Sequence, residues 1–249
     1  MTKPNYQTEY LSECAREVFP DTLVAASYYK PSVFQVNASI NEVVVLLQIP
    51  DYMDGAPHEQ TYNLLEMVKN HFLDTGSMTE HPLWQMEGYF ASPGFRERCV
   101  PVSIGRIHGW SGHQMGKHKD LDRSIKRLVE AGYLKETDHY GVAAAWLKKS
   151  SRSFCAKTDI LMKTIRVSAI LDTAMAPDFV LDYVMYHEML HAKFGLKKLY
   201  DQHDDEFVRE EHRFENWVDA ERWLTALTCR ENGEDPRHIV ETLRRRERQ

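Results

Sequence analysis

The stretch that most constrains this chain is HEMLH at residues 187–191, which puts two histidines four positions apart in an otherwise apolar segment. Pro177 favours a helix start, Gly195 favours a helix end, and the apolar residues between them recur at helical spacing. That apolar stripe consists of Phe179, Val180, Tyr183, Val184, Tyr186 and Leu190. We therefore predict a helix from Pro177 to near Gly195 that carries His187 and His191 on one face.

Two imidazoles one helical turn apart can bind the same zinc ion. The glutamate beside them, Glu188, is the residue type that acts as general base in HExxH hydrolases, where the metal activates a water molecule. A chance histidine pair on a solvated helix face would not need the apolar neighbours that surround this pair. The motif thus predicts a Zn²⁺ site at His187 and His191 with Glu188 as the catalytic residue.

A catalytic zinc site usually has three protein ligands and keeps one position open, so a third ligand is expected downstream. His203 follows His191 by twelve residues, and a loop through Gly195 could bring it back to the metal. Glu215 begins an ExxxD pattern of the kind that places a ligand and a supporting carboxylate on a following helix. His212 is the third candidate. The residues themselves leave all three open.

The chain divides by pattern into an N-terminal α+β region at 1–75, an irregular connecting segment or lid at 76–120, and a region at 121–249 that holds the motif. The segment at 76–120 is rich in glycine, proline, histidine and aromatic residues and has no sustained period. In the N-terminal region we predict helices at 7–18 and 57–73 and extended segments at 32–38 and 42–49.

In the region that holds the motif, Asp120 is a good N-cap for a helix over 121–131. Strands at 142–148, with Trp146, and at 165–171 are expected to pair as a hairpin before the motif helix. Two further segments read as helices, one at 205–228 that is broken near Phe214 and one at 236–247. The fold class expected is α+β, with a small sheet packed on the motif helix.

Composition narrows the type of site and of partner. The four cysteines, Cys14, Cys99, Cys155 and Cys229, form no CxxC pair, which suits reduced thiols in a cytoplasmic protein and leaves histidines and carboxylates as metal ligands. No stretch is apolar enough to predict a membrane span or an export signal. The net charge of −6 argues against an overall electrostatic affinity for nucleic acid.

Residues 141–225 resemble the SprT-like metallopeptidases, a zinc-dependent family of zincin fold that includes a DNA–protein crosslink protease. The matching features are the strand with Trp146, the SSRS at 150–153, IRVSAILD at 165–172, VLDYVMYHEMLHA at 180–192, HDDEF at 203–207 and EHRF at 211–214. In this family the histidine that precedes an x-x-x-Phe segment is the third ligand, which implies His203 and makes Glu215 the runner-up. The glycine usual after that histidine is Asp204 here.

The resemblance implies that residues 121–249 form a SprT-like zinc metallopeptidase domain acting on a protein or peptide substrate. It also implies a DNA contact through a local basic patch of Lys148, Lys149, Arg152 and Lys157, although a solvated turn is the favoured interpretation of that patch. His108, His113 and His118 recur every five residues in a glycine-rich segment, which favours a loop over a second metal site.

We therefore expect a zinc metallopeptidase with His187, His191 and His203 as metal ligands and Glu188 as general base. One alternative is a noncatalytic zinc-containing module that binds nucleic acid or protein; the presence of Glu188 speaks against it, because a purely structural zinc site has no use for that carboxylate. Another is a hydrolase of a different amide, with residues 76–120 shaping a small-molecule pocket.

Overall fold

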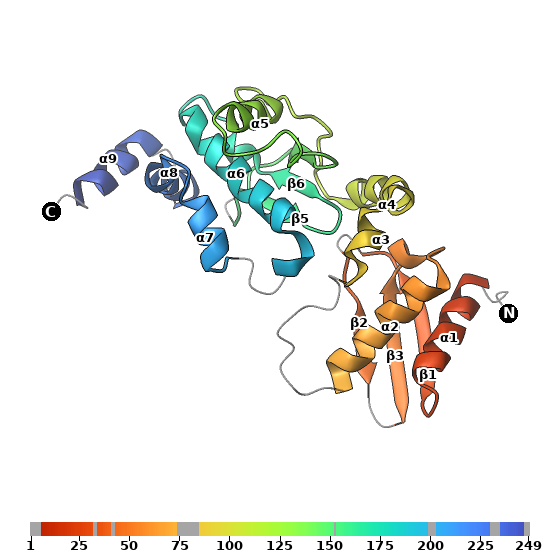
Figure 1. Cartoon of the computed structure of the whole chain (residues 1–249). Coiled ribbons are helices and arrows are strands. Elements are labelled where there is room, and N and C mark those ends of the chain that lie inside the picture. The colour runs from red at the N-terminus through yellow and green to blue at the C-terminus, as the bar shows by residue number, and fades with distance from the viewer. Residues whose placement is uncertain are drawn as a thin grey trace. The chain divides into compact units, whose positions relative to one another are not determined.

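A computed structural model describes residues 6–31, 34–40, 43–73, 85–151, 153–198, 203–229 and 235–246. The chain divides into two compact units, Met1–Arg106 and Ile107–Gln249, and each is described separately. Each contains a three-stranded sheet with helices, so the protein is α+β, as predicted (Figure 1). None of the helices in the described ranges has the length and apolar content needed to cross a membrane.

Unit 1 begins with α1 (Tyr6–Val18), followed by β1 (Leu23–Tyr29), β2 (Asn37–Ile40), β3 (Val44–Pro50) and α2 (His58–Leu73). The strands are ordered β1-β3-β2, with β1 parallel and β2 antiparallel to β3. Alternation along β3 buries Val45, Leu47 and Ile49, as expected for a sheet covered on one face. The two helices and the strand at 42–49 are confirmed. The strand β1 was missed, and residues 34–36 of the extended segment predicted at 32–38 are irregular.

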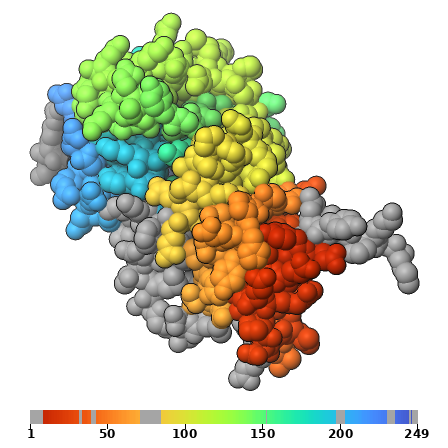
Figure 2. All heavy atoms as spheres, turned by 45° about the vertical axis from the view of Figure 1, so that its right-hand side comes forward, coloured from red at the N-terminus to blue at the C-terminus, as the bar shows by residue number. Residues whose placement is uncertain are grey.

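The prediction of an irregular segment at 76–120 is wrong for its middle part, which forms α3 (Glu87–Ala91) and α4 (Pro93–Arg106). Both helices belong to unit 1. Arg106 of α4 makes a bidentate ion pair with Asp51 of η1 (Asp51–Met53), and Arg98 donates to the carbonyl groups of Tyr52 and Gly55. In Figure 2 the yellow atoms of this region lie directly against the orange atoms of α2 and its neighbours. The glycine and proline content concealed these helices: Pro93 and Gly94 stand in the first turn of α4, where both are tolerated, but Pro101 lies inside the helix.

The sheet of unit 2 contains β4 (Ala143–Trp146), β5 (Ala156–Asp159) and β6 (Thr164–Val167), in the order β4-β6-β5. The predicted hairpin between the first and last of these is wrong, because β4 pairs parallel to β6. The strand that forms the hairpin with β6 is β5, which the sequence reasoning missed. The strand predicted at 165–171 ends at Val167 and continues as the short 3-10 helix η3 (Ala169–Leu171).

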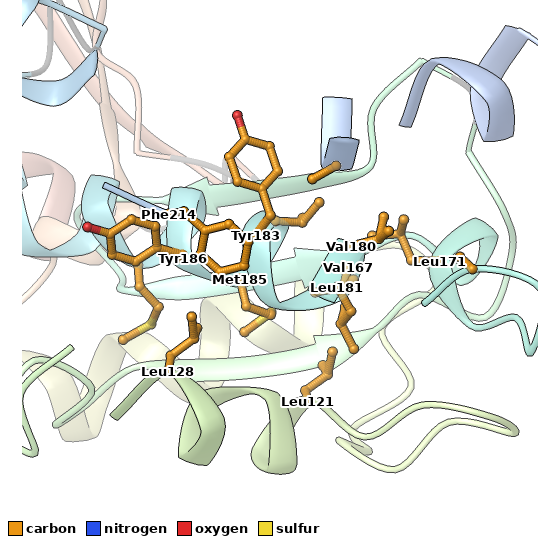
Figure 3. Close-up of a cluster of buried hydrophobic side chains, with 14 of the residues drawn as sticks. Leu121, Leu128, Val167, Leu171, Val180, Leu181, Tyr183, Met185, Tyr186 and Phe214 are labelled. Carbon is orange, nitrogen blue, oxygen red and sulfur yellow. The ribbon is translucent and has the colours of Figure 1, made fainter. Parts of the chain in front are cut away.

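The centre of unit 2 is α6 (Asp178–Phe194), which begins after Pro177 and ends at Gly195, as predicted. The φ of Gly195 is 63°, a left-handed conformation that favours glycine at a helix end. Helix α6 packs against α5 (Leu121–Glu130) and β5, and further helices cover its other sides. Figure 3 shows side chains of α6, including Leu181 and Met185, meeting Leu121 and Leu128 of α5 in the core. The N-cap of α5 is Asp120, which confirms that prediction.

After α6, the described residues of unit 2 form the short 3-10 helix η4 (Gly195–Lys198) and the α-helices α7 (Asp205–Glu211), α8 (Trp217–Cys229) and α9 (Pro236–Arg246). The break predicted near Phe214 is confirmed, because α7 ends before it and α8 begins after it. Phe214 is buried against Tyr133, Tyr183 and Tyr186, so the turn between the two helices is anchored in the core. Both α7 and α8 contact α6, the helix that carries the HEMLH motif.

Candidate metal centre

His187 and His191 lie one turn apart on α6, and their Nε2 atoms are 3.1 Å apart. His191 is buried, whereas His187 is partly exposed at the edge of the core. The two ring planes are nearly perpendicular. Both side chains thus direct the same ring nitrogen to a common point beside the helix.

His203 joins this pair from the chain that precedes α7. Its Nε2 lies 3.4 Å from Nε2 of His187 and 3.2 Å from Nε2 of His191. The next residue, Asp204, is the N-cap of α7 and accepts a hydrogen bond from the backbone N–H of Phe207 at 2.9 Å. A side-chain cap therefore fixes the start of the helix directly after His203.

The other two candidates for the third ligand lie elsewhere. Glu215 is exposed, and its backbone N–H donates to the Tyr133 hydroxyl. The exposed imidazole of His212 stacks on Trp217 at a ring distance of 3.9 Å. Within the described residues, only one group of histidine, cysteine or acidic side chains has its ligand atoms gathered closely enough for a metal ion, and its members are His187, His191 and His203.

The spacing of the three nitrogens fits zinc. A tetrahedral zinc ion with Zn–N bonds of about 2.0–2.1 Å separates two nitrogen ligands by about 3.3–3.4 Å. The Nε2 atoms of the three histidines are 3.1, 3.2 and 3.4 Å apart. Three neutral imidazoles are also the donors that zinc accepts in sites that retain an open position. The residues present therefore fit a zinc ion in number, chemistry and spacing.

Glu188 is almost fully buried between α6 and the sheet. Its Oε2 accepts a hydrogen bond from the Thr158 hydroxyl at 2.6 Å, and that hydroxyl also lies 3.1 Å from the Glu188 carbonyl oxygen. Thr158 belongs to β5, an edge strand of the sheet, and this strand packs against α6. Burial raises the pKa of Glu188, an effect opposed by the hydrogen bond from Thr158 and the charge of His187. The carboxyl is thereby held in one orientation next to the histidines.

The three imidazoles differ in their electrostatic setting. Burial, reinforced by repulsion from His187 and His203, lowers the pKa of His191 to about 3. Burial also lowers the pKa of His187, but the hydrogen bond with Glu211 and the charge of Glu188 outweigh burial and raise it above the ordinary value. Burial raises the pKa of Glu211, but its bond to His187 dominates and lowers it. The contact raises the pKa of the imidazole and lowers the pKa of the carboxyl group, as expected for a charge-assisted hydrogen bond.

Sequence reasoning missed the carboxylates that support the site. Glu211, the last residue of α7, lies with Oε1 2.5 Å from Nδ1 of His187. The Tyr183 hydroxyl donates to Oε1 of Glu211 at 2.9 Å and contacts Oε1 of Glu221 at 2.7 Å. The sequence held one indication of this network: Tyr183 precedes His187 by four residues, so the two side chains share a face of the helix. Glu211 and Thr158 gave no local signal, because only the packing of α7 and β5 brings them to the site.

None of the remaining described residues that were singled out by pattern belongs to the metal group. Three lysines of the basic patch, Lys148, Lys149 and Lys157, are exposed, and Arg152 lies outside the described residues. The DNA contact stays a prediction. The histidines at 108, 113 and 118 are exposed in the segment before α5, and none of them belongs to the metal group.

Comparisons with known proteins identify no relative. No protein-family model, no curated protein and no solved structure matches this chain.

Proposed function

We propose that this protein is a zinc-dependent hydrolase of the SprT-like, zincin type that cleaves peptide bonds. The observation that carries the proposal is the convergence of three imidazole Nε2 atoms, 3.1–3.4 Å apart, beside a buried carboxyl group on the same helix. In this proposal His187, His191 and His203 hold the zinc ion, and Glu188 is the catalytic residue. The metal, when bound, supplies the Lewis acidity that acidifies a water molecule and polarises a carbonyl group.

The protein's own residues supply orientation and proton transfer. The Thr158 hydroxyl donates a hydrogen bond to Oε2 of Glu188 and so orients the carboxyl group. The other oxygen, Oε1, would accept the proton that a nucleophilic water gives up. Glu188 would then deliver this proton to the departing amine, so that one carboxyl group serves both halves of the hydrolysis. Burial raises the pKa of Glu188 above its ordinary value, and the hydrogen bond from Thr158 opposes that shift.

Two features favour catalysis over a noncatalytic zinc module. A structural zinc site is closed by four protein ligands, whereas in the described residues three ligand atoms converge. In addition, a structural site does not need a buried glutamate fixed by a threonine hydroxyl. A peptide bond is proposed as the target because the motif and the segments around it resemble a peptidase family. The DNA contact through the basic patch is kept as a prediction of that resemblance.

The proposal is tested with full-length protein and a Glu188→Gln variant. Purified wild-type protein should contain about one zinc ion per chain and cleave an unfolded protein substrate such as casein, alone or with DNA. Glu188→Gln should keep the metal and lose cleavage. Glu210→Gln is the matched control, because Glu210 pairs with Arg213 on the surface and its carboxylate does not touch the histidines. The alternative, a noncatalytic zinc module that binds nucleic acid, would be favoured by a different result. In that case the protein contains zinc but cleaves nothing, and its DNA binding weakens when the three lysines of the basic patch are neutralised.

The third ligand is tested by comparing His203→Ala with Glu215→Ala. Loss of His203 removes one of three ligands, so zinc affinity should fall by several orders of magnitude, whereas Glu215→Ala should leave it unchanged. The measurement is competition with a chelator of known affinity. Equal affinities in both variants would refute the assignment of His203.

A further inference from the structure

Three helices of unit 2 meet at the hydroxyl group of Tyr183. The phenol projects from α6 and contacts Glu211 of α7 at 2.9 Å and Glu221 of α8 at 2.7 Å. In Figure 3 the ring of Tyr183 lies at the edge of the labelled cluster, and its hydroxyl points away from the labelled apolar side chains. Its ring is buried, so the position of the hydroxyl is set by core packing rather than by surface motion.

Glu211 connects this hydroxyl to the metal centre. The same oxygen, Oε1, that accepts from Tyr183 lies 2.5 Å from Nδ1 of His187. An ionised carboxylate can only accept hydrogen bonds, so Nδ1 of His187 must carry the proton in this contact. In a neutral imidazole the lone pair is then on Nε2, the atom that faces His191 and His203. The contact thus selects the tautomer that can bind a metal.

We propose that Tyr183 and Glu211 are positioning residues that fix the tautomer and ring orientation of His187, with Glu221 steadying the Tyr183 hydroxyl from α8. This inference rests on the proposed zinc site. Tyr183 donates its single hydroxyl proton into the space between two carboxylates, which limits their mutual repulsion and holds the Glu211 carboxylate against the imidazole. Partners of this kind on a zinc-binding histidine increase its basicity and metal affinity.

The first test measures zinc affinity of Tyr183→Phe, Glu211→Ala and the control Glu210→Gln by chelator competition. Glu211→Ala should bind zinc about 10- to 100-fold more weakly. Tyr183→Phe keeps the ring in the core and should weaken binding less, in the same direction. Glu210→Gln, one residue away on α7, should bind as wild type does. Wild-type affinity in both Glu211→Ala and Tyr183→Phe would overturn the inference.

The second test reads the tautomer of His187 directly in the metal-free protein. Nitrogen-15 NMR of the histidine rings, followed as the pH is raised until the His187 ring is neutral, distinguishes a proton on Nδ1 from one on Nε2. In the wild type the ring should be in the Nδ1–H form, and both Tyr183→Phe and Glu211→Ala should raise the Nε2–H population. A ring that stays wholly in the Nδ1–H form in both variants would overturn the inference even if zinc binding weakens.

The two proposals fail in different ways. A wild-type protein that binds no zinc refutes the proposed function and leaves the tautomer measurement to stand on its own. A wild-type protein that binds zinc, with unaltered affinity and tautomer in the variants, refutes only the role of Tyr183 and Glu211.

Discussion

Replacing Phe207 with alanine should weaken the metal centre without removing a ligand. Phe207 is fully buried, and its ring centre lies 5.2 Å from that of His187, 4.7 Å from that of His191 and 4.9 Å from that of His203. One aromatic ring therefore contacts all three proposed ligands and limits their rotation. We expect Phe207→Ala to let each imidazole turn away from the common point.

The size of the effect follows from these contacts. Ordering a side chain on binding costs about 0.5–1.5 kcal/mol, so freeing three imidazoles costs about 1.5–4.5 kcal/mol of binding free energy. That amounts to about 10- to 2000-fold in the dissociation constant for zinc. Removing a buried phenylalanine should also lower the free energy of unfolding by about 3–5 kcal/mol. Chelator competition measures the first quantity and urea denaturation the second.

A matched variant separates positioning from general destabilisation. Phe95 is as deeply buried as Phe207 but belongs to unit 1. Phe95→Ala should lower the free energy of unfolding by a similar amount and leave zinc affinity unchanged. The reasoning is refuted if Phe207→Ala retains wild-type zinc affinity, or if Phe95→Ala lowers zinc affinity as strongly.

Three further outcomes are expected. Removing zinc with a chelator should lower the melting temperature, because a ligand that binds only the native state adds about 2.7 kcal/mol to the free energy of unfolding when present at about 100 times its dissociation constant. A melting curve that changes with neither chelator nor zinc would contradict the site. Gly116→Ala should lower the free energy of unfolding in urea by about 1–3 kcal/mol, since a Cβ there would lie 2.6 Å from Cγ of Asp172, and an unchanged value would show that the loop yields freely. The hydrogen bond from Lys119 lowers the pKa of Asp178, and burial opposes this with a smaller effect. The ionised carboxylate therefore stabilises the fold at pH values above its unfolded pKa of about 3.9. That stabilisation is lost as the pH falls through the lower pKa of the folded state. Asp178→Asn should thus melt below wild type at neutral pH, and the gap should close as the pH falls through the lowered pKa of Asp178; a pH-independent gap would count against the ion pair.

The helix that carries the motif was predictable because its signals are local. Pro177 and Gly195 mark its ends, and the residues between them repeat at helical spacing. The strand order was not predictable in this way. Strand β5 reads as polar, with Lys157 and Asp159 in four residues, and it takes its place only by pairing with β6. Parallel pairing of β4 with β6 joins segments that are not adjacent in sequence, so a hairpin was the natural but wrong expectation.

The candidate site shows the same division between local and tertiary information. His187, Glu188 and His191 come from a single helix, and their spacing determines their relation. His203 was expected from a family resemblance. Glu211 could not be recognised in the same way, because a glutamate near a helix end is ordinary until the packing of α7 on α6 brings it to the histidine.

The short helix α7, which Asp204 caps, organises one side of the candidate site. Asp204 caps the first turn through the backbone N–H of Phe207, so the start of the helix is fixed immediately after His203. Phe207 and Glu211 are four residues apart and share one face of this helix. That face puts the phenylalanine ring against the three imidazoles and the carboxylate against Nδ1 of His187. One capped helix thus connects the proposed third ligand, the ring that packs on the three histidines and the carboxylate proposed to orient one of them, because a single element sets the positions of all three relative to α6.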